Sequence, residues 1–137
     1  MTRPGRGLID TNTLILLERL EIDALPEEPL ITVITLAELS VGPLAAGDPR
    51  EQASRQVRLQ ETESAFEPLP LDAASARMFG PVAASLRRSG RKPAARAFDA
   101  LIASIALANR LDVYTCNPDD FAGIDGLNVV PVPHPDG

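Results

Sequence analysis

The chain contains few of the residues that build disulfide frameworks or metal sites rich in sulfur and nitrogen. It has one cysteine and one histidine among 137 residues. A single cysteine excludes an intramolecular disulfide and a zinc site made from several thiolates, and it suits a reducing compartment. A single histidine excludes a site made from several imidazoles. We therefore expect any metal site in this chain to use oxygen ligands.

Positive charge and aromatic rings are also scarce. The sequence has 13 Lys and Arg against 19 Asp and Glu, a formal net charge of −6, and 4% aromatic residues. This balance excludes a protein that coats nucleic acid through bulk positive charge, but it leaves open a nucleic-acid enzyme with a local binding site. Because stacking platforms for bases are few, phosphate contacts should dominate any such binding.

Long hydrophobic runs are absent as well. No apolar stretch approaches the ~20 residues of a membrane-spanning helix, and the first residues lack the apolar core of a signal peptide. We therefore expect a cytoplasmic protein. The length and the 45% content of hydrophobic residues predict one domain over residues 1–137, with a core from about 7 to 132 and a tail at 133–137.

Short apolar runs alternate with amphipathic stretches along the chain. Strands are expected at residues 7–9, 30–33, 69–71, 113–116 and 128–132. Helices are expected at residues 12–20, 35–41, 50–65, 73–88 and 94–109, with a kink or division at Gly80-Pro81. This alternation predicts an α/β fold, with three α/β/α layers around a central parallel sheet of four to five strands. Ligands of such sheets bind beyond the carboxyl ends of the strands.

Acidic and amide side chains follow the expected strands. Asp10 comes directly after the first strand, Glu38 follows the second, and Asn117 and Asp120 follow the strand at 113–116. Asp99 lies beside the apolar stripe of a strongly periodic helix. Two charges ~4 Å apart repel by about 4 kcal/mol at an effective dielectric constant of 20. A cluster of these carboxylates therefore calls for protonation or for a hard cation such as Mg²⁺ or Mn²⁺.

Several of these residues also have a purely structural interpretation. Asp10 is able to cap the first helix, and Thr35 and Glu38 have the spacing of a capping box, with Glu38 at its third position. Thr11 and Asn12 are typical turn residues, so their role is either to shape the turn or to position a ligand. Asp99 has no comparable structural explanation, because a carboxylate beside an apolar stripe needs a partner.

Four segments in this order resemble the motifs of one family. They are Leu8-Ile9-Asp10-Thr11-Asn12, Ile34-Thr35-Leu36-Ala37-Glu38-Leu39, Phe98-Asp99-Ala100-Leu101-Ile102-Ala103 and Thr115-Cys116-Asn117-Pro118-Asp119-Asp120-Phe121. Together they resemble PIN-domain ribonucleases, and most of all the VapC-type toxins of toxin–antitoxin pairs. The resemblance implies a PIN-like fold and a metal-dependent endoribonuclease with Asp10, Glu38 and Asp99 as its acidic core. It also implies a homodimer and a VapB-type antitoxin that occludes the site.

The fourth motif departs from the family pattern at two positions. At one motif position, many relatives have an acidic residue, whereas this sequence has Asn117. At another, relatives often have a basic residue, whereas this sequence has Cys116. Asp120 is then the expected fourth acid, with Asp119 and Asn117 as alternatives. Asn117 before a proline is equally typical of a turn.

The mechanism expected from the acidic cluster and the resemblance is hydrolysis of RNA. Asp10, Glu38 and Asp99 would hold Mg²⁺, or Mn²⁺, directly or through water, with Asp120 or Asn117 completing the shell. A water activated by the metal would attack the phosphorus and leave 5′-phosphate and 3′-hydroxyl ends. The main alternative is a PIN-like module that binds protein or RNA without catalysis. A phosphoaspartate receiver is a third possibility, disfavoured because no lysine follows the strand at 113–116.

Basic residues gather just before the Asp99 helix. They are Arg87, Arg88, Arg91, Lys92 and Arg96. They would either form a phosphate clamp for RNA or a solvated helix end with a favourable dipole. Arg96 also has the i, i+3 spacing for a pair with Asp99. The sparse apolar side of residues 50–65, together with Met78 and Phe79, is expected to leave a groove for a partner segment.

Overall fold

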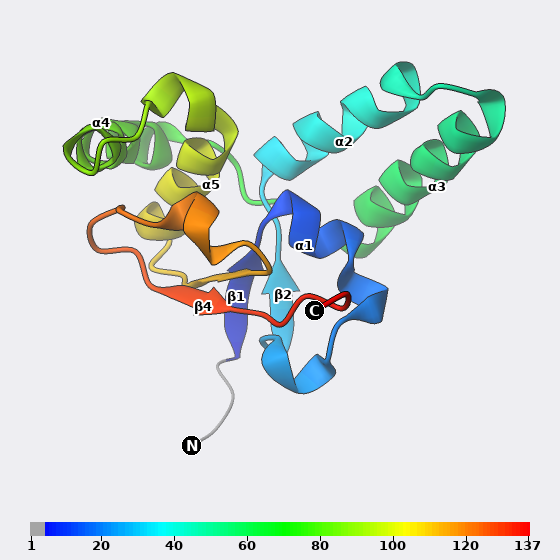
Figure 1. Ribbon diagram of the computed structural model, residues 1–137, viewed down its shortest axis with the longest axis horizontal. Helices are drawn as coiled ribbons and strands as arrows, with labels where there is room; N and C mark the ends of the chain where they lie inside the picture. The colour runs from blue at the N-terminus through cyan, green and yellow to red at the C-terminus, as the bar shows by residue number, and fades with distance from the viewer. Residues whose placement is uncertain (1–4) are drawn as a thin grey trace.

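The computed structural model describes residues 5–137, with one α-helix between the first two strands and four consecutive α-helices between the second and the third (Figure 1). The strands are β1 (Arg6–Ile9), β2 (Glu28–Leu30), β3 (Val113–Thr115) and β4 (Val129–Pro131). The helices are α1 (Thr11–Ile15), α2 (Val33–Ala45), α3 (Pro49–Ala65), α4 (Ala73–Arg88) and α5 (Ala97–Ala108). Short 3-10 turns occupy Leu17–Arg19, Ile22–Ala24, Pro93–Arg96 and Pro118–Phe121.

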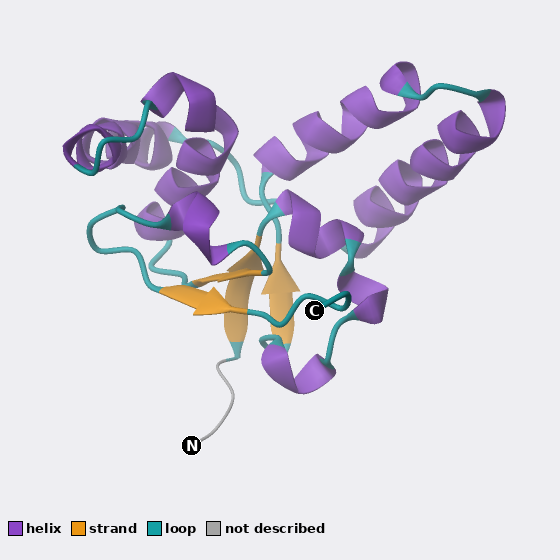
Figure 2. Ribbon diagram, in the orientation of Figure 1, coloured by secondary structure: helices purple, strands orange, loops and turns teal. Residues whose placement is uncertain are grey.

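The four strands form one parallel sheet in the order β2-β1-β3-β4. Leu8 is in register with Leu30 on one side and with Val113 on the other. Parallel neighbours require crossover connections. Helices lie in those from β1 to β2 and from β2 to β3, whereas a 3-10 turn and loops connect β3 to β4 (Figure 2). The predicted α/β class and parallel sheet are therefore confirmed, and the carboxyl ends of β1 and β3 lie at the same edge.

Side chains of the central strands alternate between two hydrophobic clusters. Leu8 and Val113 pack with residues of α4 and α5, whereas Ile9 and Tyr114 pack with Leu14 and other residues around α1. This period-two alternation sends successive residues to opposite faces of a sheet. Both faces are covered, which is the three-layer arrangement predicted.

Gly7 in β1 allows the sheet to close against Tyr114. A Cβ atom at this position would lie 2.5 Å from Cε1 of Tyr114 and 3.0 Å from Cγ of Pro26. Any larger side chain would displace this buried ring. The glycine therefore allows close packing between β1 and the neighbouring strand.

Several predicted boundaries were wrong. β2 ends at Leu30, and α2 begins at Val33 and continues through Gly42 and Pro43 to Ala45. The reason is local, because the hydroxyl of Thr32 accepts from the backbone N–H of Thr35 and caps the helix early.

Two helices and one strand also differ from the prediction. The first helix ends at Ile15 instead of residue 20 and continues as a 3-10 turn. α4 runs undivided through Pro81, since it packs along α5 over much of its length. The strand expected at 69–71 is a single parallel bridge between Thr32 and Leu69. Within residues 5–137, no helix has both the length and the hydropathy needed to cross a membrane.

Candidate active site

Four acidic side chains come from four separate elements near the carboxyl edge of the sheet. Asp10 follows β1, Glu38 lies in α2, Asp99 lies in the first turn of α5, and Asp120 lies in the 3-10 turn after β3. The fold therefore assembles residues that are up to 110 positions apart along the chain.

Asp10 is buried, with 2% of its surface exposed. Burial raises the pKa of this carboxyl group, and hydrogen bonds from Thr13 and Thr115 oppose the rise. The hydroxyl of Thr13 donates to Oδ1 of Asp10 and accepts from the backbone N–H of Cys116 at 3.0 Å. Thr13 thus ties α1 to the end of β3 and holds Asp10 in place.

Glu38 is held by two threonines. The hydroxyl of Thr11 donates to Oε1 of Glu38 at 2.7 Å, and the hydroxyls of Thr11 and Thr35 are 2.9 Å apart. Since the single hydroxyl proton of Thr11 goes to Glu38, Thr35 is the donor to Thr11. Burial raises the pKa of Glu38, the Thr11 hydrogen bond lowers it, and the charge of Asp10 raises it further.

The capping box predicted for Thr35 and Glu38 is wrong. Thr32 is the N-cap of α2, so Thr35 lies inside the helix and Glu38 does not reach back to its start. The carboxylate of Glu38 is consequently available to the acidic site. The pattern misled because Thr32 and Thr35 are both good capping residues, three positions apart.

Asp99 carries the clearest electrostatic signature of the site. Burial raises its pKa, and the negative charges of Asp120, Asp10 and Glu38 raise it further, to about 6. Arg96 offsets part of this effect. Because each of these carboxylates acts on Asp99, they form one electrostatic cluster. The pKa of Asp99 thus responds to carboxylates from three other elements, and the common cation site predicted from the strand ends stays a prediction.

Asp120 forms an ion pair with Arg96 at 2.6 Å. The predicted pairing of Arg96 with Asp99 is therefore wrong, because the 3-10 turn after β3 brings a second carboxylate to the same guanidinium. Asp119 is exposed. The backbone N–H of Asn117 donates to the hydroxyl of Thr115 at 2.9 Å, and Asn117 begins the 3-10 turn. Asn117 thus shapes this turn.

The other basic residues before α5 do not form a single clamp around the acidic site. Arg87 and Lys92 are exposed, Arg91 is half-buried, and Arg88 pairs with Asp125. Within residues 5–137, Arg96 is the one member of this group that interacts with the acidic cluster. Asn12 is exposed at the start of α1, next to Thr11.

The donor set fits a hard divalent cation. It consists of carboxylate oxygens whose charges repel one another, and a bound cation would offset that repulsion. In the part of the chain that the structure describes, no three Asp, Glu, His or Cys side chains already form a set of ligands around one point.

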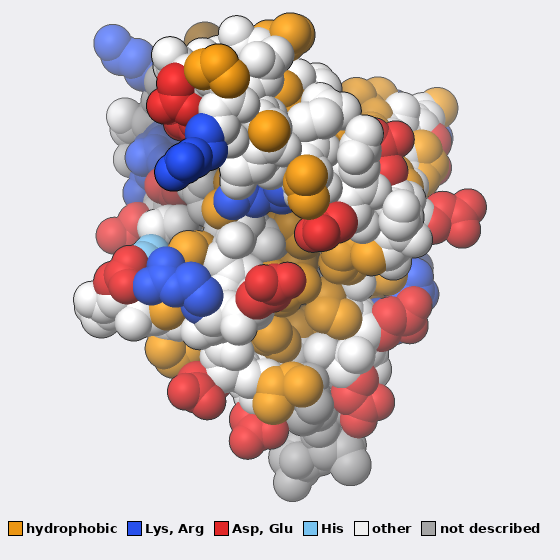
Figure 3. Space-filling view, turned by 90° about the vertical axis from the view of Figure 1, so that its right-hand side faces the viewer, with side chains coloured by type: hydrophobic (Ala, Val, Ile, Leu, Met, Phe, Trp, Pro, Cys, Tyr) orange, Lys and Arg blue, Asp and Glu red, His pale blue; other side chains and the backbone are white. Residues whose placement is uncertain are grey.

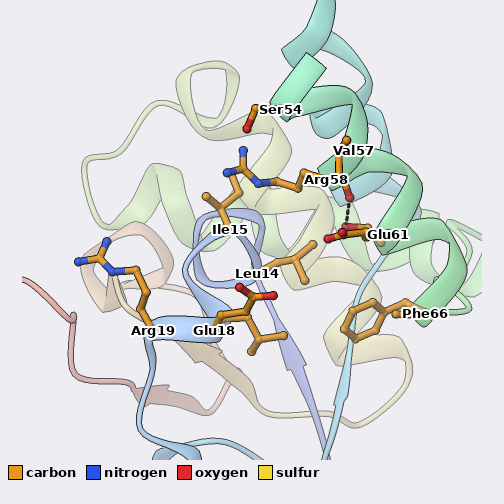
Figure 4. Close-up of a pocket in the computed structure, with 12 residues that line it drawn as sticks. Leu14, Ile15, Glu18, Arg19, Ser54, Val57, Arg58, Glu61 and Phe66 are labelled. Carbon is orange, nitrogen blue, oxygen red and sulfur yellow. Dashed lines mark hydrogen bonds between the residues drawn. The ribbon is translucent and has the colours of Figure 1, made fainter. Parts of the chain in front are cut away.

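A groove of about 410 Å³ lies between α1 and α3 (Figure 4). Its apolar lining includes Leu14, Ile15, Val57 and Phe66. The predicted groove beside residues 50–65 is therefore present. The expected contribution of Phe79 was wrong, because this ring packs against the core cluster with α4 and α5.

Residues 8–127 match the PIN domain family. The chain belongs to this family, as the four motifs indicated. Ribonuclease VapC5 of Mycobacterium tuberculosis is 38% identical over 134 residues, which cover 96% of each chain. Ribonuclease VapC4 of the same organism is 30% identical over 93% of this chain and 97% of its own.

Solved structures show the same likeness. One is the crystal structure of VapBC-5 from Mycobacterium tuberculosis, a member of the VapBC family of toxin–antitoxin systems. It is 36% identical, with a TM-score of 0.82, and the match covers 94% of this chain and 100% of that chain.

Proposed function

We propose that this protein is a VapC-type toxin, an endoribonuclease that hydrolyses RNA phosphodiester bonds with the help of a divalent cation. The proposal is supported most directly by the placement of Asp10, Glu38, Asp99 and Asp120, which come from four separate elements near the carboxyl edge of the sheet. Likeness to two ribonucleases over nearly the whole chain supports the same activity.

Each side chain has a distinct role in this proposal. Asp10, Glu38 and Asp99 bind Mg²⁺ or Mn²⁺, directly or through water. When bound, the cation supplies Lewis acidity, which lowers the pKa of water and offsets charge on the phosphodiester. Thr13 orients Asp10, and Thr11 orients Glu38. Asp120, paired with Arg96, is the fourth acid and borders the site without needing to touch the cation.

Water as the attacking group determines the products. Hydrolysis by water does not use the 2′-hydroxyl of RNA, so cleavage leaves 5′-phosphate and 3′-hydroxyl ends. A nuclease that used the 2′-hydroxyl would leave a cyclic phosphate instead. The ends of the cleaved RNA therefore test the mechanism directly.

We also propose a VapB-type antitoxin as the regulatory partner and a homodimer as the assembly. A solved relative is a member of a toxin–antitoxin family, and the apolar groove between α1 and α3 offers a surface for a partner segment. A toxin that cuts RNA and is restrained by such a partner acts in the cytoplasm.

The decisive experiment compares RNA ends from cells that express the wild-type protein or the Asp99→Asn variant. We expect new 5′-phosphate ends with the wild type and none with the variant, because Asp99 is the centre of the acidic cluster. Asp23→Asn is the matched control, since Asp23 is exposed and lies outside the site. Cleavage that persists in Asp99→Asn would contradict the assignment.

The alternative function, a non-catalytic binding module, makes a different prediction. It is favoured only by the unusual fourth motif, in which Asn117 shapes a turn. Purified wild-type protein would then fail to cleave RNA at any Mg²⁺ or Mn²⁺ concentration, while still binding it. Titration with Mn²⁺ would show no binding that depends on Asp10 and Asp99.

A further inference from the structure

A second, smaller cavity adjoins the acidic site on the side of α3. Its volume is about 280 Å³, and it is lined both by residues of the acidic site and by two arginines. The lining residues are Thr11, Asn12, Ile15, Glu38, Leu39, Gly42, Arg55 and Arg58. The two guanidinium groups thus share a cavity with the threonine and glutamate described above. The basic cluster before α5 includes neither of them.

The two arginines differ in what they already bind. Arg55 donates to the carbonyl oxygen of Gly42 at 2.9 Å and forms an ion pair with Glu51. These contacts tie α3 to α2 and occupy its guanidinium. Arg58 is half-buried, yet among residues 5–137 its guanidinium forms no hydrogen bond or ion pair. Its guanidinium is thus free to bind an anion that is supplied from outside the chain.

Arg58 lies where the small cavity meets the apolar groove, and it lines both. Its side chain reaches from α3 toward Ile15 of α1 (Figure 4). On this side of the molecule, basic atoms lie sunk among hydrophobic side chains, with acidic side chains around them (Figure 3). Arg58 itself is half-buried, and the lower polarity of such a site strengthens the attraction of a guanidinium for an anion.

We propose that Arg58 binds a phosphate of the RNA next to the bond that is cut, and so positions the strand across Glu38 and Asp10. This inference rests on the proposed ribonuclease function and extends it to the substrate-binding residue. A planar guanidinium binds phosphate through two parallel hydrogen bonds. In a protein of net charge −6, such a local cation is needed to hold an RNA backbone beside carboxylates.

The surroundings of Arg58 limit where the phosphate binds. Glu18, Glu61 and Arg19 line the larger groove together with Arg58. Because Arg19 is paired with Asp136, the charges of the two glutamates disfavour a phosphate there. In the smaller cavity, Arg55 is already paired with Glu51, and the remaining acid is Glu38, which the proposed cation would neutralise. The cavity next to the acidic site is thus the more favourable place for the phosphate.

The test measures RNA binding in the Asp99→Asn background, so that no cleavage interferes. A labelled single-stranded RNA is titrated with protein at several salt concentrations, and anisotropy is recorded. We expect Arg58→Ala to weaken binding about tenfold. The slope of log affinity against log salt should fall by about 0.7, the value for one phosphate contact on a single strand. In the active protein, Arg58→Ala should raise KM and change kcat little.

Two variants serve as comparisons. Arg50→Ala removes the same charge from an exposed position on α3, about 12 Å away along the helix axis, and should leave binding unchanged. Arg58→Lys keeps the charge but loses the two-point geometry, so it should preserve the salt slope with intermediate affinity. Thermal melting checks that every variant is folded.

The possible failures are distinguishable. If the wild type neither binds nor cleaves RNA, the proposed function is wrong, and this inference falls with it. If the wild type cleaves RNA but Arg58→Ala binds like Arg50→Ala, the inference alone is wrong. An Arg58→Ala variant that loses binding to the antitoxin but not to RNA would show that the anion is a carboxylate of the partner, and would overturn the proposal.

Discussion

At the scale of single residues, Asp99 is the side chain whose pKa is affected by all the other carboxylates of the site. Partial burial and three other carboxylates raise its pKa to about 6. Arg96 lowers this pKa only in part, because its guanidinium forms an ion pair with Asp120. The folded protein is destabilised by this arrangement when no cation is bound. Such unfavourable electrostatics are typical of functional sites, because the ligand removes them.

This property leads to a prediction about pH and stability. An ordinary aspartate titrates near 3.8, so the charge of Asp99 opposes folding increasingly as pH rises from about 4 to 6, and constantly above 6. Without divalent cations, Asp99→Asn should raise the free energy of unfolding at pH 7 by roughly 1 kcal/mol, after allowance for solvent screening. Urea unfolding in EDTA at pH 4 and pH 7 measures the difference.

At pH 4 the two proteins should be equally stable, because Asp99 is then protonated in the folded state. A gain of the same size at both pH values would show that the substitution acts through packing instead of charge. A loss of stability at pH 7 would contradict the clustered charges.

The acidic residues were predictable from the sequence, and their partners were not. Asp10, Glu38 and Asp99 follow strands or interrupt an apolar stripe, which are local signals. Thr13 and Arg58 carry no such signal. The role of Thr13 depends on the backbone of Cys116, 103 positions away, and that of Arg58 on a cavity shared by three helices.

At the scale of elements, β1, β3 and β4 were predicted to within one residue at each end, whereas among the helices only α3 and α4 were. α3 and α4 were expected within one residue of their observed bounds, because each has a clear cap and a helical pattern. β2 was displaced because residues 28–33 are compatible with extended structure throughout, and only pairing with β1 selects Glu28–Leu30. The segment 69–71 was also predicted as a strand, but Leu69 pairs only with Thr32, in a single bridge.

The contact between β1 and β3 gives a prediction at this scale. Gly7→Ala should lower the free energy of unfolding by about 1–3 kcal/mol, because the new methyl group overlaps the buried ring of Tyr114. Gly5→Ala is the control, since no atom lies within 4 Å of a Cβ at that position. Chemical denaturation of both variants measures the effect. Equal stability of the two would show that the ring moves aside at no cost.

At the scale of the whole molecule, the α1–α3 groove leaves apolar side chains on the surface. Ile15 is 39% exposed and Val57 is 51% exposed, and both line it. Hydrophobic surface of this kind is typical of an interaction site. In the proposed function, an antitoxin segment covers it, and the same segment closes access to the acidic site.

A substitution in the groove should separate inhibition from catalysis. Val57→Asp places a charge among apolar side chains, so the antitoxin should bind at least tenfold more weakly. RNA cleavage by the free variant should remain near the wild-type rate, because Val57 does not line the cavity beside Glu38. Cleavage assays with increasing antitoxin measure both quantities. If the antitoxin inhibits the variant fully at the concentration that inhibits the wild-type protein, the antitoxin does not bind in this groove.

The sequence alone predicted the α/β class, the parallel sheet and the three leading carboxylates as candidate ligands, because periodicity, caps and strand ends are properties of neighbouring residues. Tertiary structure alone decided that Arg96 pairs with Asp120, that Glu38 is held by Thr11, and that Arg58 lacks a partner. The physical reason is that a side chain's charge and hydrogen bonds depend on which distant segments pack beside it. Spacing along the chain does not specify that packing.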